Sequence, residues 1–147
     1  MPAWEHDAEF LGSFFSLELD GVEVAFFTAC SGIGMEYDVV KFKQTNGAKV
    51  MEVKRPGRPK YNEVVLKRGF TPNKKLYEWF NEVVESAKPT PYKTASIVIF
   101  DRDAKEVARF NMEKFWPSKL SVSDLKAGSD EVMIEEITIQ HEFIDWV

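Results

Sequence analysis

Two dipeptides, Asp20-Gly21 and Asn46-Gly47, constrain the fold most, because each lies between segments in which apolar and polar side chains alternate. Such pairs are the preferred centres of two-residue β-hairpin turns, whose backbone needs positive φ angles. We therefore expect hairpins over residues 14–28 and 38–54. The first register places six apolar side chains on one face and two carboxylates on the other, in the pairs Leu19–Val22, Leu17–Val24, Phe15–Phe26 and Glu18–Glu23.

The second hairpin is also two-sided. Its register predicts an apolar face with the pairs Phe42–Met51 and Val40–Val53, and a charged face with the pairs Lys41–Glu52 and Val39–Lys54. The segment 55–59, RPGRP, follows this hairpin. We expect its prolines to end the strand, because proline cannot donate a hydrogen bond to a sheet ladder. A further strand is predicted over residues 61–70.

One helix is expected, with Thr71 as its N-cap, Pro72 as its first residue and an end before Pro89. Its core-facing stripe consists of Leu76, Trp79, Phe80 and Val83. A third hairpin is predicted over residues 93–100 and 106–115, where Trp116-Pro117 stops it. After a looser segment over 118–130, a last strand is expected over 132–143, with Met133, Ile137, Ile139, His141 and Phe143 on one face.

The predicted fold class is mainly β (α+β): a barrel or sandwich of antiparallel hairpins, with seven or eight strands and one flanking α-helix. No repeat, low-complexity run or linker divides the 147 residues. We therefore expect a single domain over residues 1–147, with a flexible N-terminal segment over residues 1–10.

The formal net charge of −5 hides a segregation of charge along the chain. Residues 1–40 carry eight acidic and no basic side chains, residues 41–75 carry eleven Lys or Arg against two Glu, and residues 76–147 are again acidic. Three interpretations stay open: a solvated basic face, a basic surface that meets the acidic face of another copy, and a phosphate-binding stretch. Few stacking aromatic side chains are interleaved with the basic residues, which disfavours the third.

The sequence contains no constellation that supports catalysis, a cofactor or a metal. Cys30 is the only cysteine, which excludes an internal disulfide, and His6 and His141 are too far apart for a metal-binding helix motif. We expect Cys30 to be a small buried apolar residue and His141 to be a structural histidine on a strand face. The segment 32–34, GIG, lacks the context of a nucleotide-binding loop. A binding or structural role is therefore favoured.

No segment approaches the length of a membrane-spanning helix, and the first nine residues carry acidic side chains where a signal peptide carries basic ones. We therefore expect no membrane anchor and assembly in the cytoplasm.

Long hairpins covered by a single helix leave sheet edges exposed, and such edges must be protected. A ring closed by strand addition removes every edge, and a basic ribbon on an acidic body favours head-to-tail stacking of such rings.

Four segments carry a family resemblance. The stretch 55–69, RPGRPKYNEVVLKRG, resembles a signature of the tail tube proteins of contractile phages and phage-derived contractile injection systems. Trp79 in the helix, the segment 115–117 (FWP) and the segment 135–142 (EEITIQHE) are similar to family segments that follow in the same order. The resemblance extends from about Phe14 to Ile144.

This resemblance implies six copies per ring, a continuous inner β-barrel around a lumen that carries cargo, rings stacked into a tube, and no catalysis or cofactor. It implies a contractile sheath, baseplate and tube-terminating proteins as partners, and nucleic acid only in a phage tail. The mature location would be a phage tail or a phage-like particle. The 46–47 hairpin would reach a neighbouring subunit or ring, and the segment 66–69 would close the same region. Candidate inter-subunit contacts are Lys41, Phe42, Lys43, Asn46, Gly47, Lys49, Met51, Lys54, Arg55, Arg58, Lys60, Lys67 and Arg68, and the lumen candidates are Glu18 and Glu23.

Three alternatives remain at this point: a baseplate-proximal tube initiator, the related tube protein of type VI secretion, and a monomeric β-barrel that binds a small ligand. The first two belong to the same group of folds. The third would be a monomer in solution.

Overall fold

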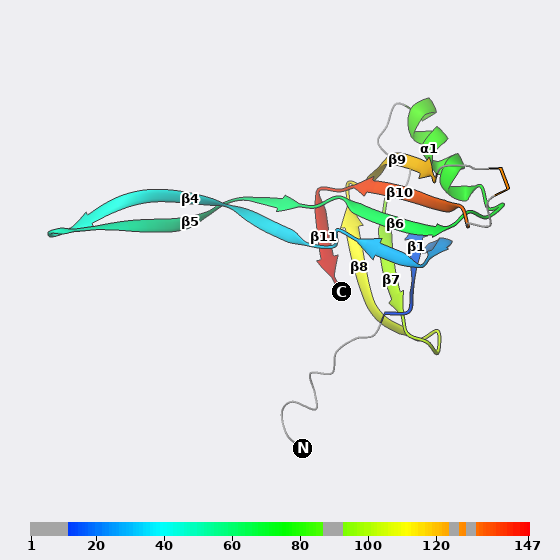
Figure 1. The fold of residues 1–147 in the computed structure, drawn as a ribbon, viewed down its shortest axis with the longest axis horizontal. Coiled ribbons are helices and arrows are strands. Elements are labelled where there is room, and N and C mark those ends of the chain that lie inside the picture. Colours follow the sequence, from blue (N-terminus) through cyan, green and yellow to red (C-terminus); the bar gives the residue numbers. More distant parts are fainter. Residues whose placement is uncertain (1–11, 87–92, 124–126, 129–131) are drawn as a thin grey trace, which may run out of the picture.

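The structure is a computed structural model, and it describes residues 12–86, 93–123, 127–128 and 132–147. The expected N-terminal segment over residues 1–10 lies outside the described residues, as does the proline pair at 89 and 91. In the described part, eleven strands and one helix follow one another (Figure 1). Their bounds are β1 Phe14–Leu19, β2 Val22–Phe27, β3 Ala29–Ser31, β4 Met35–Asn46, β5 Lys49–Tyr61, β6 Val64–Gly69, α1 Lys75–Ser86, β7 Ala95–Phe100, β8 Glu106–Glu113, β9 Trp116–Val122, β10 Ile134–Gln140 and β11 Phe143–Trp146.

The strands form two sheets and a separate ribbon. One sheet has the order β11-β8-β7-β1-β2, the other has the order β3-β6-β10-β9, and β4 and β5 pair only with each other. The chain passes from the first sheet to the second at Thr28, whose backbone N–H donates to the carbonyl of Lys67 at 2.9 Å. The predicted mainly β sandwich with one helix is confirmed. The predicted closed barrel is not present in the subunit, because the two sheets do not join into a continuous hydrogen-bonded cylinder.

The core lies between the two sheets and under the helix. The five-stranded sheet contributes Leu17, Phe27, Ile97 and Met112, and the four-stranded sheet contributes Val64, Leu66, Ile137 and Ile139. Leu76 and Trp79 of α1 complete this core, and the Trp79 ring lies 6.0 Å from the ring of Phe115. The prediction that the apolar side of the helix packs into the core is thus confirmed for Leu76 and Trp79.

Helix α1 starts later than the sequence predicts. The side chain of Asn73, rather than that of Thr71, accepts a hydrogen bond from the first helical N–H, that of Lys75, at 3.0 Å. Thr71 Oγ1 instead accepts from the N–H of Asn73 at 3.4 Å. The two polar side chains form consecutive turns before the helix, which moves its first residue from Pro72 to Lys75.

The first hairpin has a different register from the predicted one. Leu19 pairs with Val22 as expected, but a bulge between Leu17 and Glu18 inserts one extra residue in β2. Because strand side chains alternate with a period of two, one inserted residue reverses the faces beyond it. Ala25 and Phe27 therefore point to the core, and Phe26, predicted to be internal, is 47% exposed.

The turn of the β4–β5 ribbon lies one residue later in the sequence than predicted. The two turn residues are Gly47 and Ala48, and Asn46 pairs with Lys49 across the turn. Of the two turn residues, only Gly47 has a positive φ, of 68°. This geometry fits a turn with glycine at its first central position. The cross-strand partners shift by two residues, so Phe42 faces Val53 rather than Met51, and Lys41 faces Lys54 rather than Glu52. A shift of two preserves the faces, so the predicted apolar and charged faces of the ribbon are confirmed.

The prolines do not end β5. Pro56 and Pro59 lie within the strand, opposite Val39 and Tyr37. Each strand of a two-stranded ribbon has one outer edge that pairs with no other strand. A proline whose nitrogen faces that edge costs no hydrogen bond between the strands. Pro117 likewise lies in a strand, β9, at the edge of its sheet.

The third hairpin, β7–β8, is confirmed, and its polar turn is held by Asp101, whose carboxylate accepts from the N–H groups of Asp103 and Lys105 at 2.9 Å. The predicted last strand is divided into β10 and β11, which belong to different sheets. Ile137, Ile139 and His141 share the core side, as predicted, whereas Met133 and Phe143 are 39% exposed. Part of the predicted looser segment forms β9, and residues 124–126 and 129–130 of it lie outside the described residues.

Candidate assembly surfaces

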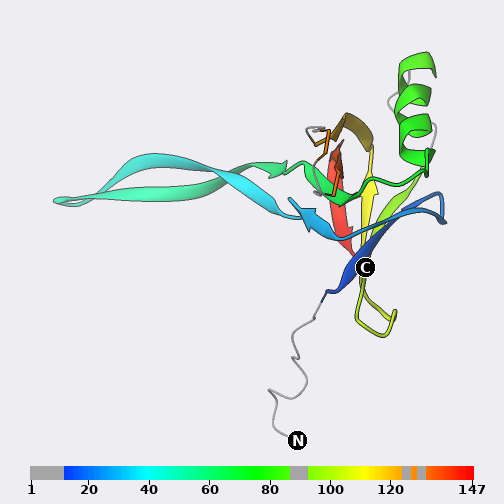
Figure 2. The ribbon, with the colours of Figure 1, turned by 45° about the vertical axis from the view of Figure 1, so that its right-hand side comes forward.

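The β4–β5 ribbon extends far from the body of the molecule (Figures 1 and 2). Its apolar face presents Val40, Phe42 and Met51, which are 50%, 45% and 52% exposed. Isolated two-stranded hairpins are at best marginally stable in water, and large apolar side chains gain nothing from remaining solvated. The ribbon therefore has the properties of an element that is completed by another surface.

The charged face of the ribbon contains a like-charge pair. Lys41 lies directly opposite Lys54, while Lys43 lies opposite Glu52. Like charges directly opposite each other destabilise a strand pair. An acidic surface placed over this face would remove that repulsion.

Eleven of the thirteen predicted contact residues lie on this ribbon: Lys41, Phe42, Lys43, Asn46, Gly47, Lys49, Met51, Lys54, Arg55, Arg58 and Lys60. Lys60 lies at its root, where its ammonium forms an ion pair with Asp38 at 2.8 Å, and this hydrogen bond raises the pKa of Lys60. Lys60 is thus already paired within the subunit.

Lys67 and Arg68 lie apart from the ribbon, on β6. Lys67 is 3.8 Å from Glu136 at the surface. Arg68 is buried, and its Nε donates to Glu135 Oε2 at 2.8 Å. Its guanidinium also lies 5.6 Å from the centre of the Phe27 ring, and Nη2 donates to the carbonyl of Asn73 at 3.3 Å. The structure therefore places Arg68 in the interior of the subunit, where it joins β6, β10 and the start of α1.

The two lumen candidates lie on the outer face of the five-stranded sheet. Glu18 and Glu23 are direct cross-strand partners, as the sequence predicts. Glu18 accepts a hydrogen bond from Arg109 Nη1 at 2.6 Å, and this bond raises the pKa of Arg109. By register, Glu113 and Asp145 share this face, and Lys93, Arg109 and Lys114 line the same surface, so it carries charges of both signs.

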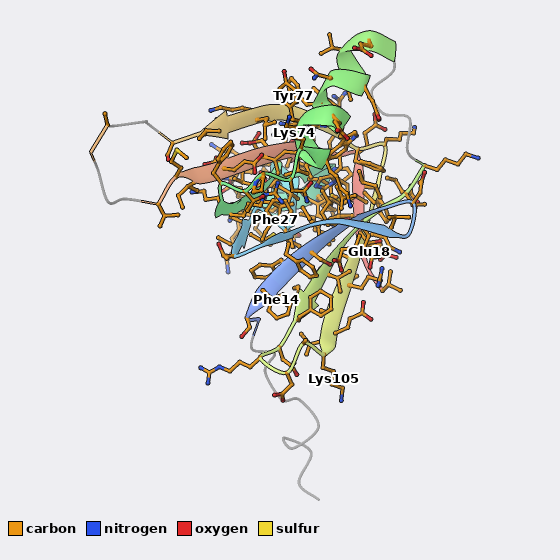
Figure 3. All side chains as sticks on the ribbon, turned by 90° about the vertical axis from the view of Figure 1, so that its right-hand side faces the viewer. Phe14, Glu18, Phe27, Lys74, Tyr77 and Lys105 are labelled. Atoms are coloured by element: carbon orange, nitrogen blue, oxygen red, sulfur yellow. The ribbon has the colours of Figure 1, made fainter. Side chains whose placement is uncertain are left out.

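An aromatic cluster at one end of this face was missed by the sequence reasoning. The Phe14 ring stacks on Phe100 with centroids 5.1 Å apart, and Phe26 meets Phe14 edge-on at 5.8 Å. Figure 3, which looks onto the end of the body opposite the ribbon, shows Phe14 and Glu18 along β1 and Lys74 and Tyr77 by α1. The bulge that turns Phe26 outward creates the cluster, and no turn residue in the sequence signals that bulge.

The remaining candidates for chemistry have structural surroundings. His141 Nε2 lies 2.9 Å from the carbonyl oxygen of Asn62, and burial is the main cause that lowers the pKa of His141. Burial raises the pKa of the Cys30 thiol to about 12, which makes it a poor nucleophile. Among the described residues, no group of three His, Cys, Asp or Glu side chains could hold a metal ion, and no helix is long and apolar enough to cross a membrane.

Comparison with known proteins decides the family. Residues 12–145 match the model of the T4-like virus tail tube protein gp19 family. The chain belongs to the tail tube protein family. It is therefore a structural tube subunit and not an enzyme. No curated protein sequence matches it significantly.

Solved structures confirm that this tail tube subunit has a tube-protein fold. A chain of the sheath-tube complex of an extracellular contractile injection system, PVC, in its extended state, is 19% identical, with a TM-score of 0.78 over 96% of this chain and 93% of that one. A chain of the anti-feeding prophage baseplate is 17% identical, with a TM-score of 0.76 over 95% of both chains. A type six secretion system protein is more distant, at 12% identity and a TM-score of 0.56 over 90% and 82% of the two chains.

Proposed function

We propose that the chain forms the main body of the inner tube of a contractile injection particle or phage tail, with six copies per ring and rings stacked around a lumen. The single observation that carries this proposal is the β4–β5 ribbon, which exposes one apolar and one basic face and has no partner strand in either sheet of the body. Such an exposed, two-sided element is suited to join copies.

Ring closure would use the open edges of the sheets. The five-stranded sheet ends in β11 and β2, and the four-stranded sheet ends in β3 and β9. Pairing of edges between neighbouring copies supplies the missing backbone hydrogen bonds, and closure around a ring leaves no edge exposed. The continuous barrel absent from one subunit would then arise only in the assembly.

The outer face of the five-stranded sheet, with Glu18 and Glu23, is the proposed lumen surface. A water-filled channel tolerates charged side chains on its wall. Nucleic acid would pass through the lumen in a phage tail, and other cargo in an injection particle.

A contractile sheath, a baseplate and a tube-terminating protein are the proposed partners. The similarity to a chain of a sheath-tube complex and to one of a baseplate supports the first two. We propose that assembly takes place in the cytoplasm and that the mature location is a phage tail or a phage-like particle.

The two alternatives to the main tube body are a type VI secretion tube and a baseplate-proximal initiator. The main tube body is favoured over a type VI secretion tube because the fold is more similar to the PVC tube complex than to the type six protein, with TM-scores of 0.78 and 0.56. A baseplate-proximal initiator remains the second candidate, because a chain of a baseplate is almost as similar.

Charge reversal on the ribbon tests the proposal. The triple variant Lys41→Glu, Lys43→Glu and Lys54→Glu should reduce the yield of tubes at least tenfold at low salt, where surface charges are screened least. A control that reverses Lys74, Lys75 and Lys105, which are exposed on the body at the start of α1 and in the β7–β8 turn, changes the net charge equally and should assemble normally. Tubes counted by electron microscopy give the result, and unchanged assembly of the ribbon variant would refute a role of this charged face.

A further inference from the structure

The turn of the ribbon carries the only Asn-Gly sequence of the chain. Asn46 is the last residue of β4, Gly47 is the first turn residue, and both are exposed. The turn lies at the end of the ribbon that is farthest from the body (Figures 1 and 2). Asparagine is a thermolabile residue. A glycine after it leaves the next backbone nitrogen accessible, because glycine has no side chain to shield that nitrogen.

Both groups that could react at this turn are accessible. Among the described residues, the Asn46 side chain makes no hydrogen bond. The hydrogen bond of a two-residue turn joins the flanking residues, here Asn46 and Lys49, so it does not engage the N–H of Gly47. A Cβ atom on Gly47 would have no atom within 4 Å, so no neighbouring group crowds the turn.

The ribbon also opposes local opening of its tip only weakly. The Asn46 amide carbon must turn from strand geometry toward the Gly47 nitrogen, which requires the last strand pairs to open. β4 and β5 pair only with each other, and an isolated two-stranded hairpin is at best marginally stable in water. Val50, beside the tip, is 65% exposed, so little apolar burial is lost when the tip opens.

The turn at Asp20-Gly21 provides a contrast within the same chain. An aspartate before glycine can undergo the analogous ring closure, but the Asp20 carboxylate accepts hydrogen bonds from the N–H groups of Lys93 and Thr94, at 2.8 and 2.9 Å. The bond from Thr94 is the main cause that lowers the pKa of Asp20, and an ionised carboxylate is a poor electrophile. The body thus holds Asp20 in an unreactive state, whereas the ribbon leaves Asn46 unrestrained.

We propose that Asn46 is a site of spontaneous deamidation in the free subunit. The Gly47 nitrogen loses its proton to hydroxide and attacks the side-chain carbonyl carbon of Asn46. A C–N bond forms and ammonia leaves with a proton from water, which gives a five-membered succinimide. Water then adds to either ring carbonyl and opens the ring to aspartate or to isoaspartate. The net change replaces the amide NH2 by OH, with one water consumed and one ammonia released.

The effect of this modification on assembly rests on the proposed function, which uses the ribbon to join copies. Both products place a carboxylate at the tip of a basic ribbon, where Lys49 is the cross-strand partner. In isoaspartate the main chain is longer by one methylene, which is incompatible with the geometry of a two-residue turn. We expect modified subunits to assemble poorly, so deamidation limits the time for which an unassembled subunit stays competent.

Peptide mapping by mass spectrometry tests the modification. The fresh subunit is kept in dilute solution at mildly alkaline pH, digested, and analysed for the mass gain that accompanies replacement of NH2 by OH. The peptide with Asn46 should convert at least tenfold faster than those with Asn62, Asn73, Asn81 or Asn111. Its rate should rise with pH, because the nucleophile is the deprotonated nitrogen. Conversion of Asn46 no faster than that of the other asparagines would overturn the proposal.

A comparison of folded and urea-unfolded protein tests whether the fold protects either turn. Unfolding should change the rate at Asn46 by less than tenfold, because the ribbon tip is already accessible. Isoaspartate at Asp20 should form at least tenfold faster in the unfolded chain, since unfolding breaks the bonds from Lys93 and Thr94. A larger acceleration at Asn46 than at Asp20 would show that the ribbon shields its own turn, and would overturn the structural argument.

The yield of tubes after ageing tests the consequence. The unaltered protein should lose tubes, counted by electron microscopy, in proportion to the fraction of Asn46 that has been converted. The control variant Asn46→Gln, aged in the same way, should keep the yield of its own fresh sample, because glutamine forms the corresponding six-membered ring far more slowly.

The outcomes separate the site from the proposed function. If the fresh unaltered protein forms no rings or tubes, the proposed function fails, while the peptide maps still decide whether Asn46 deamidates. If Asn46 converts and the aged protein assembles as well as the fresh one, the site stands and its effect on assembly is refuted. If aged Asn46→Gln protein loses tubes as fast as the unaltered protein, the loss has another cause and the effect is again refuted.

Discussion

The ion pair between Arg68 and Glu135 is the most consequential polar contact in the interior. Both side chains are 7% exposed, and a single oxygen of Glu135 lies 2.8 Å from Arg68 Nε. Removing water from two charges is costly, and only good geometry and further hydrogen bonds compensate that cost. Arg68 lies in the basic stretch of the sequence and was predicted to be an inter-subunit contact, which its burial corrects. Its burial follows from strand alternation, because Arg68 has the parity of the buried residues Val64 and Leu66.

Breaking this pair should destabilise the subunit strongly. We expect Glu135→Gln to lower the free energy of unfolding by about 3–5 kcal/mol, because it leaves the buried guanidinium without a counter-charge. Urea denaturation measures the loss. The surface variant Glu136→Gln, whose carboxylate is 3.8 Å from Lys67, should cost less than about 1 kcal/mol. Equal effects of the two substitutions would contradict the account of Arg68 as an internal residue.

His141 should make stability depend on pH. Burial lowers its pKa below the value of 6.5 that it has in the unfolded chain, so the folded state favours the neutral ring. The unfolded chain then binds the proton first as the pH falls, and the contribution of His141, complete above pH 6.5, decreases below it. We expect the melting temperature to fall more between pH 7.5 and pH 5 in the unaltered protein than in His141→Gln. Identical decreases would show that the ring is not held neutral by the fold.

At the scale of elements, glycine conformation decides how the ribbon is joined to the body. Gly32, between β3 and β4, has a φ of 88°, and a Cβ atom there would lie 1.9 Å from the carbonyl oxygen of Glu63. Gly47, at the ribbon turn, has a φ of 68° with no atom within 4 Å of that position. Both need the left-handed conformation, but only Gly32 also lacks space for a methyl group.

The two glycines form a matched pair for mutagenesis. Gly47→Ala should cost about 1–2 kcal/mol, the penalty for placing an L-residue in the left-handed region. Gly32→Ala should cost clearly more, because the backbone at Glu63, just before β6, must also move away. Thermal unfolding measures both. A smaller effect at Gly32 than at Gly47 would show that the junction between ribbon and body adapts easily.

The elements could be predicted wherever a local signal fixes them. The existence of a hairpin at Gly47, the two faces of the ribbon, the β7–β8 hairpin and the core position of Leu76 and Trp79 follow from turn chemistry and periodicity, although the turn itself lies one residue later than predicted. No local signal predicts the bulge at Leu17 or the division of the last strand, because tertiary packing determines which residue is left out of the strand pairing. The strand through Pro56 and Pro59 was missed, since its tolerance for proline depends on the ribbon having no third strand.

For the whole molecule, the segregation of charge along the sequence becomes a separation in space. The basic residues of 41–58 project on the ribbon, whereas Glu18, Glu23, Glu78 and Glu82 lie on the body. The sequence suggested this polarity, and with it a head-to-tail assembly. It could not locate these acidic side chains relative to one another, because the β1–β2 hairpin and α1, which lie together in the fold, are more than fifty positions apart in the sequence.

Electron microscopy of the purified protein over a range of concentrations, with solution mass measured alongside, tests the central claim most directly. We expect rings or stacked tubes with six copies per ring, about 100 kDa per ring for a subunit of 16.9 kDa. Ordering the ribbon has an entropic cost, so preformed tube ends should promote assembly where free subunits remain monomeric. A protein that stays monomeric at every concentration, even with tube ends added, would contradict the account.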